Sequence, residues 1–218
     1  MKYKCLILDH DDTSVKSTEE IHYPAYLETM KNIRPELEPL SLEGWIINNF
    51  SPGVLEYFRD ILGFSNDEIQ QEFEIWKGIE SKSNPHFFPG MIDLIKSFQK
   101  KGGIVAVVSH SVNESIKRHY EVNGDGALPD VIYGWDFDPE KRKPSVWPVQ
   151  QIIDKYKIIP SEILMVDDLK PGLTMAKNSG IDIAGAGWGH DVPQVREYMQ
   201  EHCNYYFDSI EGLSELIK

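Results

Sequence analysis

Two aspartates follow the first apolar segment of the chain at alternate positions. Residues 5–8 read Cys-Leu-Ile-Leu and lead directly into Asp9, His10 and Asp11. Alternate side chains of a strand point to the same side, so Asp9 and Asp11 are expected to lie together at its carboxyl end. Carboxylates that close raise each other's pKa unless a cation lies between them or one keeps its proton. The pattern indicates either a site for metal or acid–base chemistry or an ordinary polar turn.

Two later apolar segments also end in polar residues. Residues 104–108 end at Ser109, and residues 163–166 end at Asp167 and Asp168. If the first strand lies between these two in a parallel sheet, the polar groups meet in the crevice at the carboxyl ends of the strands. Four carboxylates there require a cation, and a few oxygen ligands open to water suit Mg²⁺.

The elements that must position these groups alternate along the second part of the chain. Short apolar segments and helical patterns follow one another from residue 91 to the end, which predicts an α/β fold with a doubly wound parallel sheet covered on both faces. The expected strands are 5–8, 104–108, 131–133, 163–166, 181–184 and 205–207. The strand at 131–133 leads to Lys143 and Pro144, and Lys143 supplies a positive charge to the rim of the crevice.

Residues 17–85 contain no good strand and predict a helical insert. The segment from Ser17 to Glu20 is typical of a helix start, with a hydroxyl cap and acidic residues in the first turn. We therefore expect an α/β core domain formed by residues 1–16 and 86–218 and a helical domain formed by residues 17–85. Its aromatic residues are expected to pack in cores and interfaces; they are Tyr26, Trp45, Phe50, Phe58, Phe73 and Trp76.

Composition narrows the possible partners and the compartment. The chain has 22 Lys and Arg against 35 Asp and Glu, a net charge of −13, which argues against nucleic acid and anionic membranes as partners. Cys5 and Cys203 lie far apart in the sequence, a pattern that favours reduced thiols. No apolar segment reaches the length of a secretion signal or a membrane span, so we expect a cytoplasmic protein. The sequence does not indicate an oligomeric state.

The ordered set of polar residues resembles the four motifs of the haloacid dehalogenase superfamily of phosphohydrolases. The residues that carry this resemblance are Asp9-x-Asp11-x-Thr13, Ser109, Lys143-Pro144, and Asp167-Asp168 followed by Gly172. The insert matches, in position and size, the type 1 helical cap of phosphoglycolate phosphatases and β-phosphoglucomutases. The resemblance implies a Rossmann-like core with a cap and a small phosphorylated metabolite as substrate.

The resemblance also implies a role for each carboxylate. Asp9 is expected to be the nucleophile that attacks phosphorus, giving an aspartyl-phosphate. Asp11 is expected to be the general acid and then the general base, and we expect crowding among the carboxylates to keep it protonated when substrate binds. Mg²⁺ is expected to be held by Asp9, Asp168 and the backbone carbonyl of Asp11, with Asp167 acting through water or orienting its neighbour.

Four further residues are expected to bind the phosphoryl group. Ser109 would donate a hydrogen bond to it, and Lys143 would hold it close to Asp9. Thr13 and His110, which belong to the same motif segments, complete the predicted phosphate site.

Two positions depart from the family pattern. Asp12 stands where the family usually has glycine, and Lys16 stands where many capped members have an acid. Glycine would permit a positive φ at position 12, and aspartate tolerates this better than most residues, so the turn is expected to survive.

Several alternative functions remain open. A phosphomutase would use the same core, and a non-catalytic phosphate-binding regulatory module is the simplest alternative. Asp11 disfavours a dehalogenase, because halide leaves without a proton, and the absence of an acid directly after residues 131–133 disfavours a receiver domain. Candidate specificity residues of the insert region are Lys16, His22, Asn48, Asn49, Arg59 and Lys77. We further expect residues 44–53 to form a loop that reaches toward the site.

Overall fold

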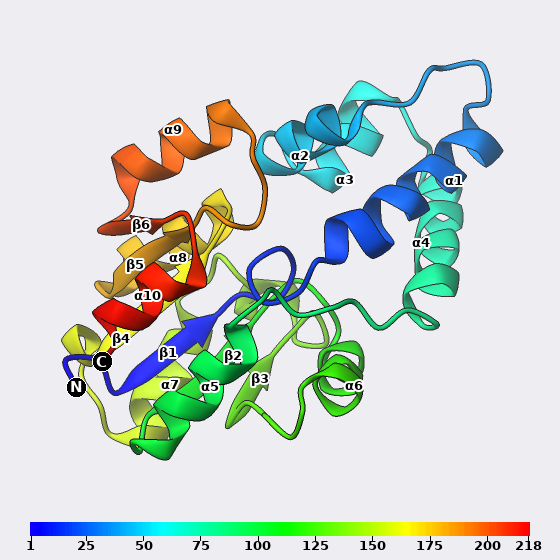
Figure 1. Ribbon diagram of the computed structural model, residues 1–218. Helices are drawn as coiled ribbons and strands as arrows, with labels where there is room; N and C mark the ends of the chain where they lie inside the picture. Colours follow the sequence, from blue (N-terminus) through cyan, green and yellow to red (C-terminus); the bar gives the residue numbers. More distant parts are fainter.

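The computed structural model describes all residues from 1 to 218 and contains one parallel sheet (Figure 1). The order of its six strands is β3-β2-β1-β4-β5-β6. The strands are β1 (Cys5–Leu8), β2 (Ile104–Val108), β3 (Val131–Tyr133), β4 (Ile163–Asp167), β5 (Asp182–Ala186) and β6 (Tyr205–Phe207). The first strand therefore lies between the strands that end at Ser109 and at Asp167, which confirms the expected convergence.

Helices cover both faces of this sheet (Figure 1). They are α5 (Met91–Lys100), α6 (Asn113–Asn123), α7 (Trp147–Tyr156), α8 (Lys170–Ser179), α9 (Pro193–His202) and α10 (Ile210–Leu216), with short 3₁₀ turns η3 (Pro139–Lys141) and η4 (Pro160–Glu162). Leu6 and Leu8 belong to the apolar core under α5, α6 and α10, whereas Cys5 and Ile7 belong to the core under α7, α8 and α9. Alternate residues of β1 are thus buried on opposite faces, as a doubly wound sheet requires.

The segment between β1 and α5 is helical and lies beyond the carboxyl ends of the strands (Figure 1). Its elements are the π-helix η1 (Thr18–His22), α1 (Tyr23–Ile33), α2 (Leu42–Phe50), α3 (Val54–Glu56), the π-helix η2 (Tyr57–Ile61) and α4 (Asn66–Glu80). Helix α4 begins with a capping box, in which Ser65 Oγ accepts from the Glu68 N–H and the Glu68 carboxylate accepts from the Ser65 N–H.

The helical insert has an apolar cluster of its own and a second contact with the main core. Its cluster consists of Tyr26, Met30, Trp45, Tyr57, Phe58 and Phe64. Ile46 and Phe50 of α2 instead pack in the core under α9. Phe73 and Trp76 differ from the expectation of core packing, because Phe73 is exposed and Trp76 is only half-buried.

The prediction of a loop at residues 44–53 is wrong, and the prediction that the two cysteines are free thiols is confirmed. Most of the 44–53 segment is the helix α2, and the Asn48 side chain donates back to the Gly44 carbonyl of the same helix.

Both cysteines are free thiols. No helix combines the length and the apolar character of a membrane-spanning segment.

Candidate active site

Three aspartates and one lysine meet at the carboxyl end of the central strands. Leu8 of β1 pairs with Val166 of β4, so Asp9 and Asp167 leave adjacent strands at the same level. Lys143 Nζ lies 2.8 Å from Asp9 Oδ1 and 2.8 Å from Asp167 Oδ2. Carboxylate oxygens of Asp9, Asp167 and Asp168 lie within 4.8 Å of one another, and all three residues are buried.

Burial and mutual repulsion dominate the electrostatics of this group. Burial raises the pKa of Asp9 well above its usual value, and Asp167, Asp168 and Asp11 raise it further, while Lys143 opposes the shift. Burial likewise raises the pKa of Asp167 to about 6 despite the charge of Lys143. Burial disfavours the charged form of Lys143, but the two carboxylates outweigh it and raise the lysine pKa above its usual value.

The donor set of this cluster fits a magnesium ion. All three aspartates offer oxygen ligands, and when they are ionised the single positive charge of Lys143 leaves two negative charges in excess. A hard divalent cation takes oxygen ligands of this kind and removes the excess charge. Asp167 already accepts from Lys143 and from the Leu169 N–H, which leaves it suited to act through water or to orient its neighbours.

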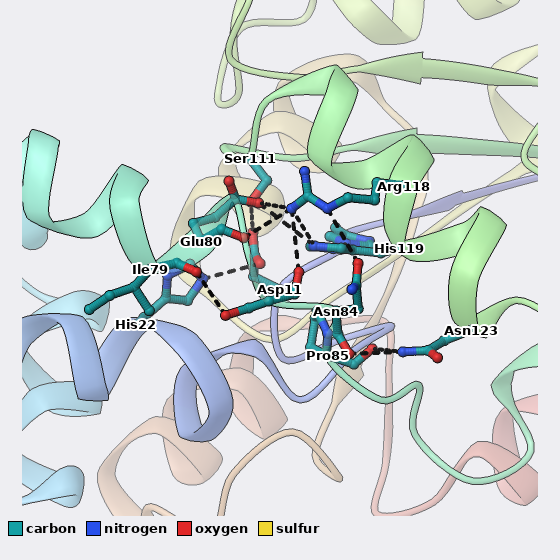
Figure 2. A network of polar contacts seen from close by, with 12 residues as sticks. Asp11, His22, Ile79, Glu80, Asn84, Pro85, Ser111, Arg118, His119 and Asn123 are labelled. Carbon is teal, nitrogen blue, oxygen red and sulfur yellow. Dashed lines mark hydrogen bonds and ion pairs between the residues drawn. The ribbon is translucent and has the colours of Figure 1, made fainter.

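The second carboxylate of the motif, Asp11, faces a different set of partners (Figure 2). Its Oδ2 accepts hydrogen bonds from Ser109 Oγ at 3.2 Å and Ser111 Oγ at 2.7 Å, and its Oδ1 lies 3.2 Å from His22 Nε2. Burial alone would raise the pKa of Asp11, but the hydrogen bonds from His22 and Ser111 bring it well below its usual value. In this state the contacts of Asp11 favour its ionised form, and its protonation when substrate binds stays a prediction.

Thr13 and His110 contact other site residues. Thr13 Oγ1 donates to Asp168 Oδ1 at 3.0 Å, and the Thr13 carbonyl accepts from Trp188 Nε1 at 2.9 Å. His110 Nε2 lies 2.7 Å from the Lys143 carbonyl oxygen and donates to it. Each of them thus orients a residue of the charged cluster.

The turn after Asp11 survives the replacement of glycine. Asp12 adopts φ of 54°, and its Oδ1 accepts the Thr18 N–H at 2.9 Å at the start of η1. A Cβ on Gly189 would lie 2.1 Å from the Asp12 carbonyl oxygen, so the segment after β5 approaches this turn closely only because residue 189 is glycine. His190 follows, with Nε2 at 3.4 Å from Asp168 Oδ2.

A second close approach fixes the paired aspartates. A Cβ on Gly172 would lie 2.1 Å from Asp167 Oδ2, so the first turn of α8 can lie against Asp167 only without a side chain at position 172. This gives a physical reason for the glycine that follows the paired aspartates in the sequence.

A buried polar network links the end of the insert to the core (Figure 2). Arg118 of α6 donates to Glu80 Oε1 at 2.8 Å and to the Glu80 carbonyl at 3.0 Å. His119 Nε2 lies 3.7 Å from the same carboxylate oxygen, and His119 Nδ1 lies 2.9 Å from His10 Nε2. Asn123 adds hydrogen bonds to the carbonyls of residues 84 and 85. The chain that returns from the insert is therefore held beside the Asp9–Asp11 segment.

A cavity of about 150 Å³ lies between the insert and the core. It is lined on one side by Thr18, Glu19 and helix α2, including Glu43, and on the other by Asp12 and the segment from Gly189 to Val192. Its lining contains four carboxylates and no lysine or arginine.

Sequence reasoning missed Ser111 and His190 as members of the site and named His22 only as a candidate specificity residue of the insert region. Ser111 lies two residues beyond Ser109, and both hydroxyls reach the same oxygen of Asp11. The alternation of Ser109 and Ser111 was an available signal, whereas the approach of His22 and His190 depends on tertiary folding.

Comparison with known proteins relates this geometry to one family. The model of the haloacid dehalogenase-like hydrolases matches residues 6–186. The phosphoglycolate phosphatase of Aquifex aeolicus is 24% identical over 196 residues, covering 86% of each chain. That of Vibrio vulnificus is 27% identical over 106 residues, which cover 49% of this chain and only about half, 46%, of that relative.

Solved structures share the fold at low sequence identity. A protein from Bacteroides fragilis, described as a haloacid dehalogenase-like hydrolase, has a TM-score of 0.81 with 18% identity over 97% of this chain and all of its own. The CbbY protein of Rhodobacter sphaeroides, a mutant solved in complex with xylulose-1,5-bisphosphate, has a TM-score of 0.69 with 18% identity and covers 95% of this chain and 94% of its own. With the family model spanning most of the chain and the motif residues gathered in one crevice, the chain belongs to the haloacid dehalogenase-like hydrolases.

Proposed function

We propose that this protein is a Mg²⁺-dependent phosphatase that hydrolyses a small phosphate monoester through an aspartyl-phosphate. The observation that carries the proposal is the position of Lys143, which touches Asp9 and Asp167 at 2.8 Å in a buried cluster of three carboxylates. Such a cluster provides a nucleophile, a fixed positive charge and oxygen ligands within one crevice. The phosphoglycolate phosphatases among the relatives support the same reaction class.

The reaction proceeds in two transfers. An oxygen of the Asp9 carboxylate attacks phosphorus, the bond from phosphorus to the ester oxygen breaks, and that oxygen takes a proton from Asp11. A water molecule then attacks phosphorus and gives a proton to Asp11. The bond between phosphorus and the Asp9 oxygen breaks, so inorganic phosphate leaves and the Asp9 carboxylate is restored. Because the contacts of Asp11 favour its ionised form, the proton for the first transfer must arrive with the substrate or from water.

The charged residues of the cluster divide the remaining tasks. Asp9, Asp168 and the backbone carbonyl of Asp11 would hold Mg²⁺, with Asp167 acting through water. The bound ion supplies charge neutralisation at the transferring phosphoryl group. Lys143 holds the phosphoryl group close to Asp9 by its charge.

The hydroxyl and imidazole groups around the cluster bind or orient. When substrate binds, the Ser109 hydroxyl turns from Asp11 to donate to a phosphoryl oxygen, while Ser111 keeps its bond to Asp11. Thr13 and His110 support the phosphate site through Asp168 and Lys143, the residues with which they form hydrogen bonds.

We assign residues 17–85 as a cap domain on a core of residues 1–16 and 86–218. The cavity between them is lined by four carboxylates against one histidine, and this excess of acidic groups would repel a second negative charge on the substrate. A phosphate ester with an uncharged leaving group is therefore the expected substrate class, in preference to phosphoglycolate itself. The reduced cysteines support a cytoplasmic location.

The test is phosphate release from a panel of esters, with Mg²⁺ and with a chelator. The panel contains phosphoglycolate, sugar phosphates and glycerol phosphate, so that charged and uncharged leaving groups are compared. Metal-dependent release is expected, with the uncharged leaving groups preferred. Release that persists in chelator would contradict the role of the metal, and release of phosphate from phosphoglycolate alone would contradict the specificity.

A further inference from the structure

We propose that Trp76 of helix α4 positions the general acid and base Asp11 by fixing the tautomer of His22. This inference rests on the role of Asp11 in the proposed function. Trp76 Nε1 donates to His22 Nδ1 at 3.0 Å, and His22 Nε2 lies 3.2 Å from Asp11 Oδ1. The helical insert thus reaches Asp11 through two side chains in sequence, one from α4 and one from η1.

The chemistry of the three groups determines where the ring proton lies. An indole N–H can only donate, so His22 Nδ1 must act as acceptor, and the imidazole is neutral in this arrangement. The remaining ring nitrogen, Nε2, then carries the proton and donates it to the carboxylate of Asp11. In the other tautomer an N–H would face the indole N–H, and a nitrogen lone pair would face the carboxylate, so both contacts would be lost.

His22 completes the set of donors that orients Asp11. Ser109 and Ser111 fix the Oδ2 atom, and His22 is the donor that fixes Oδ1. Both oxygens of the proton-transfer group are therefore held in place, Oδ2 from the core and Oδ1 from the insert. Trp76 contributes by keeping the proton on His22 Nε2, so that His22 donates a hydrogen bond to Asp11.

A substitution can separate the effect of the indole N–H of Trp76 from the effect of its aromatic ring. The rings of Trp76 and His22 lie nearly parallel, with centroids 6.3 Å apart, and the Trp76 ring also lies 5.7 Å from that of Phe73. Trp76→Phe keeps an aromatic ring at this place and removes the donor. Trp45 offers a matched control, because it also lies in the insert and its buried Nε1 has no hydrogen-bond partner.

The kinetic test compares esters whose leaving groups differ in their need for a proton. Trp76→Phe is expected to lower kcat/KM for an alkyl phosphate about 2- to 10-fold, the factor that one hydrogen bond supplies. The loss should be smaller for p-nitrophenyl phosphate, whose leaving group departs without protonation, and Trp45→Phe should leave both rates within about 2-fold. An equal loss with both esters would indicate a purely structural role and overturn the proposal.

A second variant tests the tautomer itself. In His22→Ala no ring remains whose tautomer Trp76 could fix, so adding Trp76→Phe to it should cause no further loss. A further loss in the double variant, equal to that in the wild-type background, would overturn the proposal.

Nuclear magnetic resonance provides a readout that does not depend on activity. Two-bond proton–nitrogen correlations of the imidazole rings distinguish the two tautomers, and His22→Ala assigns the signal. The wild-type protein is expected to show His22 with its proton on Nε2, and Trp76→Phe should populate the other tautomer. A proton on Nδ1 in the wild-type protein would overturn the proposal. If no ester releases phosphate but the tautomer is as expected, the proposed function fails while the contact of Trp76 stands.

Discussion

Replacement of Arg118 by methionine should destabilise the protein by about 3 kcal/mol, because it leaves the buried carboxylate of Glu80 without a charged partner. The Glu80 side chain is 6% exposed and that of Arg118 is 27% exposed, so the pair is more shielded from water than a surface pair. Arg118 also donates to the Glu80 carbonyl and to Asn84 Oδ1, and those bonds are lost with it. The partial exposure of the arginine places the expected loss at the lower end of the range for a broken buried pair.

The assay is urea unfolding, followed by far-ultraviolet circular dichroism, of Arg118→Met and two companions. Arg118→Met combined with Glu80→Met should recover most of the loss, since no buried charge remains. Arg196→Met is the matched control. Its partners Asp191 and Asp208 are 88% and 69% exposed, so the control should lose no more than about 1 kcal/mol. If Arg118→Met cost no more than the control, the buried link between insert and core would be refuted as a source of stability.

Three further predictions concern single residues. Lys143→Met should lower kcat on every active ester by at least about 100-fold, because a transition-state charge contact is typically worth that much; an unchanged kcat would remove Lys143 from the mechanism. Gly172→Ala should lower phosphatase activity at least about 10-fold by displacing Asp167, and full activity would show that the close approach is dispensable. Burial raises the pKa of Glu72 to about 7, so its ionisation opposes folding as pH rises from about 4.5 through 7. Glu72→Gln should therefore be more stable than wild type by about 1–2 kcal/mol at pH 8 and equal to it at pH 4, as measured by urea midpoints; a difference that did not change with pH would contradict this.

The sheet and the gathering of its polar ends could be predicted because they depend on local patterns. Apolar segments such as 104–108 are too short and β-branched for helices, and their alternation with helices requires parallel strands. Once β1 lies between β2 and β4, Asp9, Ser109 and Asp167 must meet. The position of these residues at the ends of adjacent strands is therefore sufficient to predict that they share one site.

The orientation of the side chains could not be predicted in the same way. Thr13 and His110 belong to motif segments, yet the structure directs their polar atoms to Asp168 and to the Lys143 carbonyl. The contacts that favour the ionised form of Asp11 could not be predicted, because Ser111 and His22 approach it through tertiary packing. Such contacts depend on crossing angles and rotamers, for which the spacing of residues carries no signal.

Reductive trapping of the acyl phosphate tests the central claim most directly. Borohydride added during turnover with Mg²⁺ and an active ester should convert the phosphorylated aspartate to homoserine, which peptide mass spectrometry locates. We predict modification at Asp9, dependent on both substrate and metal, with no phosphate release by Asp9→Asn. Modification at a different residue, or turnover that continues in Asp9→Asn, would contradict the assignment of Asp9 as the nucleophile.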